Sequence, residues 1–330
     1  MRTPLCDLLG IEAPVVLAPM GGAVTPRLAA AVSNAGGLGL LPLTWTAPDE
    51  IHAVIDETRR RTERPFGVNL GLAWDQRARL AAALAAGVRI VSFFWGDASG
   101  IIPQAHEAGA IVFVTVGTAE EGRVAAAAGA DVVVAQGWEA GGHVWGTVST
   151  VALVPRVVDA VAPVPVVAAG GIADGRGLAA VLALGAVGAW VGTRFLAASE
   201  AEVHPDYRRR ILAARESDTF YGTLFDHGWP DAPHRVLRNS TVDGWERAGR
   251  PVSGSRPGEM DEPASRPDGS PVNRYASATP TAAMTGDVEP LSHWAGQGVG
   301  LVTREESAAA ITKSLVAEAE ETIKSLAGHR

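Results

Sequence analysis

The chain has 330 residues, of which 47% are hydrophobic and 19% charged, and its formal net charge is -8. This composition excludes global disorder and argues against a general nucleic-acid-binding protein. A single cysteine, Cys6, excludes an intrachain disulfide and fits a reducing, cytoplasmic location. We expect no signal peptide and no membrane helix, because no apolar run is long enough.

Short β-branched runs alternate with alanine-rich helical patterns in the first 200 residues. Strands are expected at 14–19, 38–42, 66–70, 89–95, 111–116, 131–136, 164–169 and 188–192. Helices are expected at 26–35, 48–61, 75–86, 100–108, 118–128, 155–161 and 174–184. The strands are continuously apolar, as in parallel sheets covered on both faces. Eight such units favour a (β/α)8 TIM barrel over an open, doubly wound sheet.

A Rossmann-like open sheet is the rival fold. The glycine-rich stretch 35–39 is the nearest match to a dinucleotide fingerprint. However, its glycines close a helix and precede a strand, whereas the fingerprint follows a strand and opens a helix. The barrel therefore remains the prediction.

The character of the chain changes after residue 200. We expect 1–200 to form the barrel and 201–286 to form a smaller, mainly helical inserted domain that covers the substrate. Its stretch 250–290 is rich in Pro, Gly and Ser, which indicates either an extended segment over another surface or a disordered linker. Residues 287–330 are expected to return to the barrel as C-terminal helices. One helical pattern covers 287–295 and a second covers 304–327.

Polar and glycine residues follow several strands at the end where barrel enzymes place their active groups. The first strand runs into Met20, Gly21 and Gly22, whose backbone can face a ligand edge. Asn69 ends the third strand and Gln136 the sixth. One amide could merely cap a loop, but two at equivalent ends favour a shared polar ligand.

Glycine-rich turns follow the seventh and eighth strands, the position at which barrels bind phosphate. Gly170 and Gly171 come after the seventh strand, and Gly192 and Thr193 after the eighth. Their N–H groups and the threonine hydroxyl are suitable phosphate donors. The sequence therefore predicts a phosphorylated ligand without identifying it.

Gly141, Gly142 and His143 follow the sixth strand and form the central motif. Backbone without side chains next to an imidazole suits a planar cofactor beside a proton-transfer base. Glu139 is four residues before His143, but the glycines between them spoil a helical metal pair, so no metal is expected. Gln297 lies in a late glycine-rich stretch, which could be a simple loop between two helices or could fold back so that Gln297 touches the ligand.

Five motifs together resemble the nitronate monooxygenase family of flavin-dependent barrel proteins. They are APMGG at 18–22, QGWEAGGH at 136–143, AAGGIADGRG at 168–177, GTRF at 192–195 and AGQGVG at 295–300. Flavin-dependent enoyl-carrier-protein reductases and some NAD(P)H:quinone reductases share the Glu-x-Gly-Gly-His core. An FMN-dependent reductase of quinones or enoyl thioesters is therefore the alternative, and a non-redox phosphate-binding barrel is a third.

The resemblance implies FMN as the cofactor and a nitroalkane or nitronate plus O2 as substrates, with no nucleic acid or membrane partner. A homodimer is left open. His143 would take the α-proton of a nitroalkane or position a nitronate, with activity rising through a histidine pKa of about 6.5. Carbonyl compound and nitrite would be the products. Of the neighbouring indoles, we expect Trp145 to face the pocket and Trp138 to lie in the core.

Overall fold

All eight strands expected from the β-branched runs form, and they lie in one parallel sheet. The structure is a computed structural model that describes residues 1–328. The strands are β1 (Val15–Leu17), β2 (Gly39–Pro42), β3 (Phe66–Gly71), β4 (Ile90–Phe94), β5 (Ile111–Val116), β6 (Val132–Gln136), β8 (Val166–Ala169) and β9 (Gly188–Val191). The sheet order is β1-β9-β8-β6-β5-β4-β3-β2, and Leu38 closes it by bridging to Val16. The fold is thus a (β/α)8 TIM barrel.

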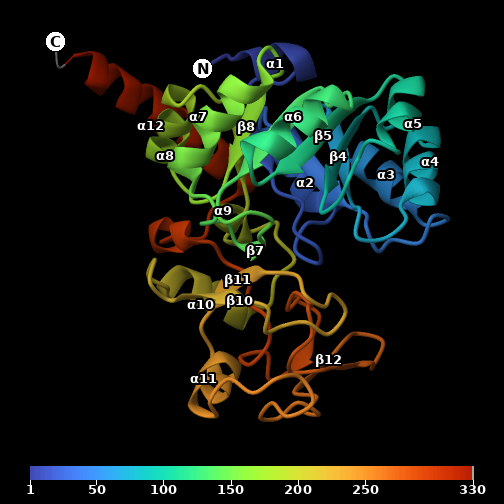
Figure 1. Cartoon of the computed structure of the whole chain (residues 1–330), viewed down its shortest axis with the longest axis vertical. Helices are drawn as coiled ribbons and strands as arrows, with labels where there is room; N and C mark the ends of the chain where they lie inside the picture. The colour runs from blue at the N-terminus through green and yellow to red at the C-terminus, as the bar shows by residue number, and fades with distance from the viewer. Residues whose placement is uncertain (329–330) are drawn as a thin grey trace.

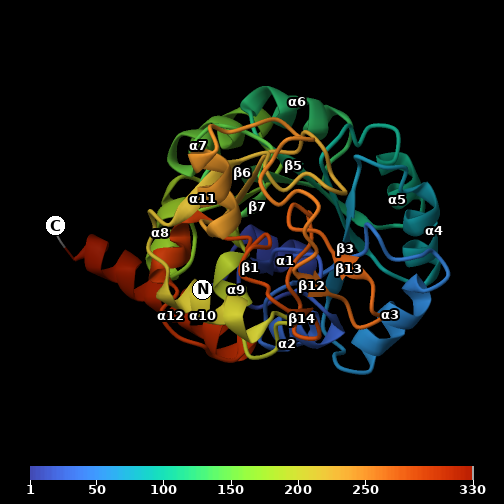
Figure 2. The ribbon, with the colours of Figure 1, turned by 90° about the horizontal axis from the view of Figure 1, so that it is seen from below.

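Helices surround the barrel as an outer ring (Figure 2). They are α2 (Pro26–Asn34), α3 (Ile51–Arg59), α4 (Arg77–Ala85), α5 (Ile102–Glu107), α6 (Ala119–Ala127), α7 (Thr150–Val161), α8 (Gly175–Ala183) and the short α9 (Thr193–Leu196). Side chains cap two of them, since Thr118 accepts from Glu121 N and Asp174 from Gly177 N. Each helix returns the chain to the same end of the barrel, so the carboxyl ends of the strands share one rim.

Alternation along the strands divides the core into two parts. Val132 and Val134 of β6 belong to the barrel interior, whereas Val133 and Ala135 pack in the larger cluster with the outer helices. Helix α1 (Pro4–Leu9) contributes Leu5, Cys6 and Leu9 to the interior cluster. The barrel is therefore a packed core with one end occupied by α1.

Two helix predictions need correction. Helix α7 begins at Thr150 and not at 155, with Pro155 inside it, where the ring removes only the hydrogen bond to the exposed Val151. The helix expected over 287–295 does not form. Its backbone instead bonds to other segments, as when Leu237 N donates to His293 O at 2.7 Å.

Residues 201–286 lie over the carboxyl end of the barrel (Figure 1). Two helices form there, α10 (Pro205–Ala213) and α11 (Ser240–Arg247), together with strands that the sequence did not predict. These strands are β10 (Thr219–Gly222), β11 (His234–Leu237), β12 (Ala264–Ser265), β13 (Pro271–Val272) and β14 (Thr285–Gly286). Strand β11 also pairs with β7 (Gly142–His143), which follows β6 of the barrel. The two parts of the chain therefore share a small sheet at the rim.

The last segment returns to the barrel. A 3-10 turn, η1 (Gln297–Leu301), precedes the long helix α12 (Ala308–Ala327), which packs mainly against α8 and projects beyond it (Figure 1). Gly175 of α8 allows this contact, since a Cβ there would lie 2.3 Å from the Cβ of Glu318. Among residues 1–328, no helix is long and apolar enough to cross a membrane.

Candidate active site

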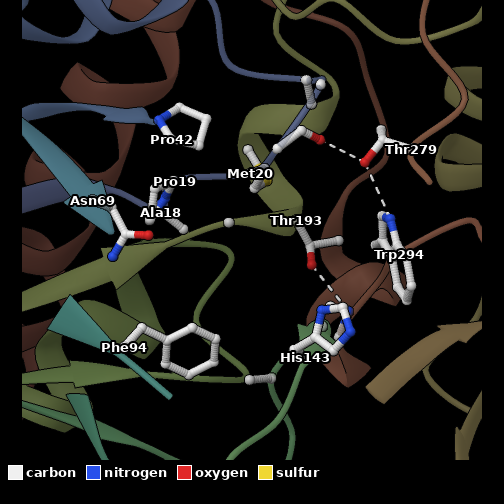
Figure 3. Close-up of a pocket in the computed structure, with 18 of the residues that line it drawn as sticks. Ala18, Pro19, Met20, Pro42, Asn69, Phe94, His143, Thr193, Thr279 and Trp294 are labelled. Atoms are coloured by element: carbon white, nitrogen blue, oxygen red, sulfur yellow. Dashed lines mark hydrogen bonds between the residues drawn. The ribbon is translucent and has the colours of Figure 1, made fainter. Parts of the chain in front are cut away.

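A cavity of about 620 Å³ opens at the carboxyl ends of the barrel strands. Every residue that the sequence nominated lines it except Gln297. These lining residues are Met20, Gly21, Gly22, Asn69, Gln136, Gly141, Gly142, His143, Gly170, Gly171, Gly192 and Thr193. The ends of five barrel strands thus meet at one rim, as Figure 3 shows for Met20, Asn69, His143 and Thr193.

The turns after β8 and β9 present unpaired backbone donors to this cavity. Among the described residues, the N–H groups of Gly171, Gly192 and Thr193 have no acceptor in the protein. Gly170 and Gly171 have φ angles of 104° and 71°, which L side chains rarely adopt. The Thr193 hydroxyl accepts from Gly296 N at 3.0 Å, so its own proton remains available to a ligand. This arrangement is an anion cradle of the kind that barrels use for phosphate.

The two strand-end amides have different surroundings. Asn69 is buried and donates to Ser92 Oγ at 3.1 Å, while its carbonyl oxygen has no protein donor among residues 1–328. Gln136 uses both ends of its amide on the following loop, donating to His143 O at 3.1 Å and accepting from Trp145 N at 2.9 Å. Asn69 thus offers an acceptor to a ligand, whereas Gln136 fixes the loop that carries His143.

The C-terminal segment touches the β6 loop at a point where only glycine fits. A Cβ on Gly141 would lie 2.3 Å from Gly296 N, and Gln297 N donates to Glu139 O at 2.9 Å. Gly296 and Gly298, not Gln297, line the cavity. The carboxylate of Glu139 accepts from Thr150 N at 2.9 Å, so it anchors the start of α7. No group of residues within 1–328 is arranged to hold a metal ion.

His143 lies in β7, opposite His234 of β11, and its ring stacks on Trp229 at 4.0 Å. Ser277 Oγ is 3.4 Å from His143 Nε2. Burial among these rings, and secondarily the charge of His234, lowers the pKa of His143 to about 3. The imidazole is therefore neutral throughout the physiological range. The value of about 6.5 applies to an unperturbed histidine, and the sequence does not reveal the aromatic surroundings that lower the pKa here.

The nitronate monooxygenase family model matches residues 2–78 and 70–318. The chain belongs to the nitronate monooxygenase family. It is 35% identical to a nitronate monooxygenase of Pseudomonas aeruginosa, with 94% of this chain and 97% of that protein covered. It is 44% identical to a 5-hydroxy-7a-methyl-1-oxo-octahydroindene-4-carboxyl-CoA dehydrogenase of Mycobacterium tuberculosis. That match covers 76% of this chain and 70% of the dehydrogenase. The structure of FabK from Thermotoga maritima superposes with a TM-score of 0.86 at 36% identity, covering both chains fully.

Nitronate monooxygenases are flavin-dependent oxidoreductases, and the residues present fit a flavin. The cavity is large enough for a cofactor, and one wall offers unpaired N–H groups for a phosphate. Gly21, Gly22 and Gly141 also line the cavity, so two barrel loops contribute backbone to its wall. The site therefore has the volume and the unpaired donors that a phosphorylated flavin requires.

Sequence reasoning missed the side chains that segment 201–294 brings to the cavity. Trp229, Ser277 and Trp294 all line it, and Thr279 joins the roof to the first barrel loop. Thr279 Oγ1 donates to Gly21 O at 2.5 Å and accepts from Trp294 Nε1 at 3.1 Å (Figure 3). No periodic pattern links these positions to the barrel strands, so no signal in the sequence could have found them.

The two indoles singled out beforehand lie beside the cavity and not in its lining. Trp138 packs under the Arg235 guanidinium, 4.4 Å from its carbon, which agrees with a structural role. Trp145 contacts Trp95 at 5.0 Å but does not line the cavity, contrary to expectation. The Trp145 N–H bond to Gln136 turns this residue away from the rim, a contact that spacing does not reveal.

Two buried histidines behind the site make stability depend on pH. His234 and His293 are fully buried, and burial lowers their pKa values to about 4 and about 3. The unfolded chain, with histidine pKa near 6.5, binds more protons below that pH, so stability falls as pH decreases. We expect the free energy of unfolding to fall by about 2 kcal/mol per histidine between pH 7 and pH 5.

Urea denaturation at the two pH values measures this change. The variant His293→Gln should lose about one third of the difference, because glutamine does not titrate and His143, whose pKa burial also lowers to about 3, contributes alongside His234. An unfolding free energy that stays constant from pH 7 to pH 5 in the unaltered protein would contradict the neutral buried state of both rings.

Proposed function

We propose that this protein binds FMN and oxidises alkyl nitronates with O2 to a carbonyl compound and nitrite. One observation carries the proposal: His143, held neutral, lines the same cavity as the unpaired N–H groups of the phosphate cradle. A cofactor phosphate and a substrate-binding imidazole thus share one enclosure. Segment 201–286, which supplies Trp229 and Ser277 to the cavity, would cover the substrate.

In this proposal the FMN phosphate sits on Gly170, Gly171, Gly192 and Thr193. Met20, Gly22, Asn69 and Gly141 would face the ring and the ribityl chain, with the Asn69 oxygen accepting a hydrogen bond. Gln136 lines the cavity and fixes the loop that carries His143, whereas Gln297 contributes through its backbone N–H, which donates to Glu139 O. When bound, the flavin supplies electron transfer between substrate and O2.

The low pKa of His143 favours one of the two roles left open for it. A base with pKa near 3 accepts a carbon-bound proton poorly, because proton transfer to it is uphill. A neutral imidazole held by Ser277 can instead orient an already ionised nitronate. The negative charge of the bound nitronate would in turn raise the proton affinity of the imidazole. We therefore propose that nitronates are the preferred substrates and that neutral nitroalkanes, which require His143 as base, react more slowly.

The stoichiometry can be tested directly. The balanced reaction converts two nitronate anions and one O2 into two carbonyl molecules and two nitrite ions. Each carbonyl carbon receives one oxygen atom of O2. With ethylnitronate we expect O2 consumption, acetaldehyde and nitrite in that ratio from yellow, FMN-containing protein. A colourless preparation that takes up no FMN, or O2 consumption without nitrite, would contradict the proposal.

The pH profile provides a second test. Because His143 is neutral above a pH of about 4, kcat/KM for preformed ethylnitronate should show no ionisation near 6.5 between pH 5.5 and pH 8. Stopped-flow mixing of nitronate into buffers across this range measures it before the anion reprotonates. A sigmoid rise centred near pH 6.5 would mean that His143 titrates normally.

A redox reaction on an acyl thioester is the second candidate. It is favoured by the 44% identity to a relative named as a carboxyl-CoA dehydrogenase. An enoyl-thioester reductase would be one such enzyme. In that enzyme, as in a quinone reductase on the same scaffold, NAD(P)H reduces the flavin. Anaerobic mixing with NADH discriminates between the candidates, because rapid bleaching of the flavin supports the reductase and an unchanged spectrum supports the oxidase.

A further inference from the structure

Five tryptophans from separate parts of the chain pack against one another, and two of them, Trp45 and Trp229, line the cavity. We define this aromatic cluster as Trp45, Trp74, Trp95, Trp145 and Trp229. Four of them follow barrel strands, and the fifth comes from segment 201–286. Ring centroids of neighbouring members are 4.8 to 5.9 Å apart, all edge to face. Aromatic pairs in this geometry attract one another beyond simple burial, so the cluster is a preformed and rigid surface.

The cluster connects the reacting centre to solvent. Trp229 stacks on His143 at 4.0 Å and contacts Trp45 at 5.9 Å, and both tryptophans line the cavity. Trp229 is buried, whereas Trp45 is 58% exposed at the rim. A group attached to the carbon that reacts beside His143 would therefore pass along one continuous aromatic wall.

Two features of this surface are energetically unfavourable for the folded chain. Trp95 has a φ angle of 66°, a conformation that costs a bulky residue free energy. Trp45 leaves most of its indole in water while packing over bare backbone, since a Cβ on Gly21 would lie 3.3 Å from its ring. An exposed aromatic surface at a cavity mouth is typical of a ligand-binding site.

We propose that the aromatic cluster selects nitronates that carry an aryl group, which deepens the proposed function and rests on it. A two-carbon nitronate has a single methyl group to place against this wall, whereas a phenyl ring can pack edge to face on Trp229 and Trp45. Aromatic contacts of this kind contribute about 0.5–1.5 kcal/mol beyond the area that they bury. The cluster is thus the specificity-determining part of the site.

Steady-state kinetics with the anions of phenylnitromethane and nitroethane test the inference. The unaltered protein should show kcat/KM at least about 10-fold higher for the phenyl substrate, equivalent to 1.4 kcal/mol. Trp45→Ala should remove about 10-fold of that value while changing the ethyl substrate by less than about 2-fold. Trp45→Phe should restore most of the preference. Trp245→Phe, a tryptophan outside the cavity lining, is the matched control and should leave both values unchanged.

Binding of unreactive carboxylates separates this inference from the proposed function. Phenylacetate should bind the flavin-loaded protein at least about 10-fold more tightly than acetate by calorimetry, and Trp45→Ala should abolish the difference. That result without nitronate turnover would refute nitronate oxidation and keep the aryl site. Equal kcat/KM for both nitronates, or Trp45→Ala weakening both equally, would overturn the aryl site and leave nitronate oxidation standing.

Discussion

Replacing His143 with alanine is expected to lower kcat/KM for neutral nitroethane by about 10²-fold, the lower end of the range for a positioned general base, because its low pKa makes this imidazole a weak base. The neutral substrate must lose its α-proton, and His143 is the histidine stacked on Trp229 with Ser277 at its Nε2 atom. For preformed ethylnitronate the decrease should be smaller, about 10-fold, because only orientation is lost. Oxygen-electrode assays on both forms of the substrate measure the two effects.

The control is the exposed His52, which pairs with Asp56 on α3 and does not line the cavity. His52→Ala should retain the activity of the unaltered protein with both substrates. Flavin content should be the same in all three proteins, because His143 is not part of the phosphate cradle. A His143→Ala protein that turns over neutral nitroethane at the original rate would exclude the histidine from the reaction.

Gly141→Ala should produce a protein that no longer retains its flavin. The new Cβ would lie 2.3 Å from Gly296 N and 2.5 Å from the carbonyl carbon of Ala295, and both contacts are backbone that cannot rotate away. Gly296 also donates to Thr193, so displacing it disturbs the cradle. We expect a loss of about 1–3 kcal/mol in unfolding free energy, as for other overpacked sites.

Flavin retention is the sharper readout for this variant. The Kd for FMN should rise at least about 10-fold, measured by fluorescence titration of the apoprotein. Gly244→Ala in α11 is a suitable control, because no atom lies within 4 Å of the added Cβ. It should bind FMN normally and gain slightly in helix stability. Undiminished FMN affinity in Gly141→Ala would show that the C-terminal segment does not support the site.

The barrel could be predicted because local signals agreed along the first 200 residues. Each buried strand such as 131–136 is a β-branched run, and helix starts such as Asp174 are marked by capping residues. Closure of the sheet then brings strand ends to one rim by geometry alone. That is why Asn69 and Gly171, more than 100 residues apart, could be assigned to one cavity.

What the sequence could not reveal depends on contacts between distant segments. Strand β7 consists of two residues and exists because β11, some 90 residues later, pairs with it. Gln297 is held by Glu139 through backbone bonds, so its side chain carries no pattern that predicts its place. The pKa of His143 follows from Trp229, a residue whose position no periodicity defines. Propensity describes single elements, whereas these features arise only from packing between them.

The central claim is that a flavin in the barrel mouth takes electrons from a nitronate bound beside His143. Anaerobic mixing of the FMN-loaded protein with ethylnitronate, followed by admission of O2, tests it most directly. The account predicts loss of the visible flavin absorbance with nitronate, no loss with NADH, and recovery when O2 is admitted. A spectrum that nitronate leaves unchanged, while NADH bleaches it, would contradict the account.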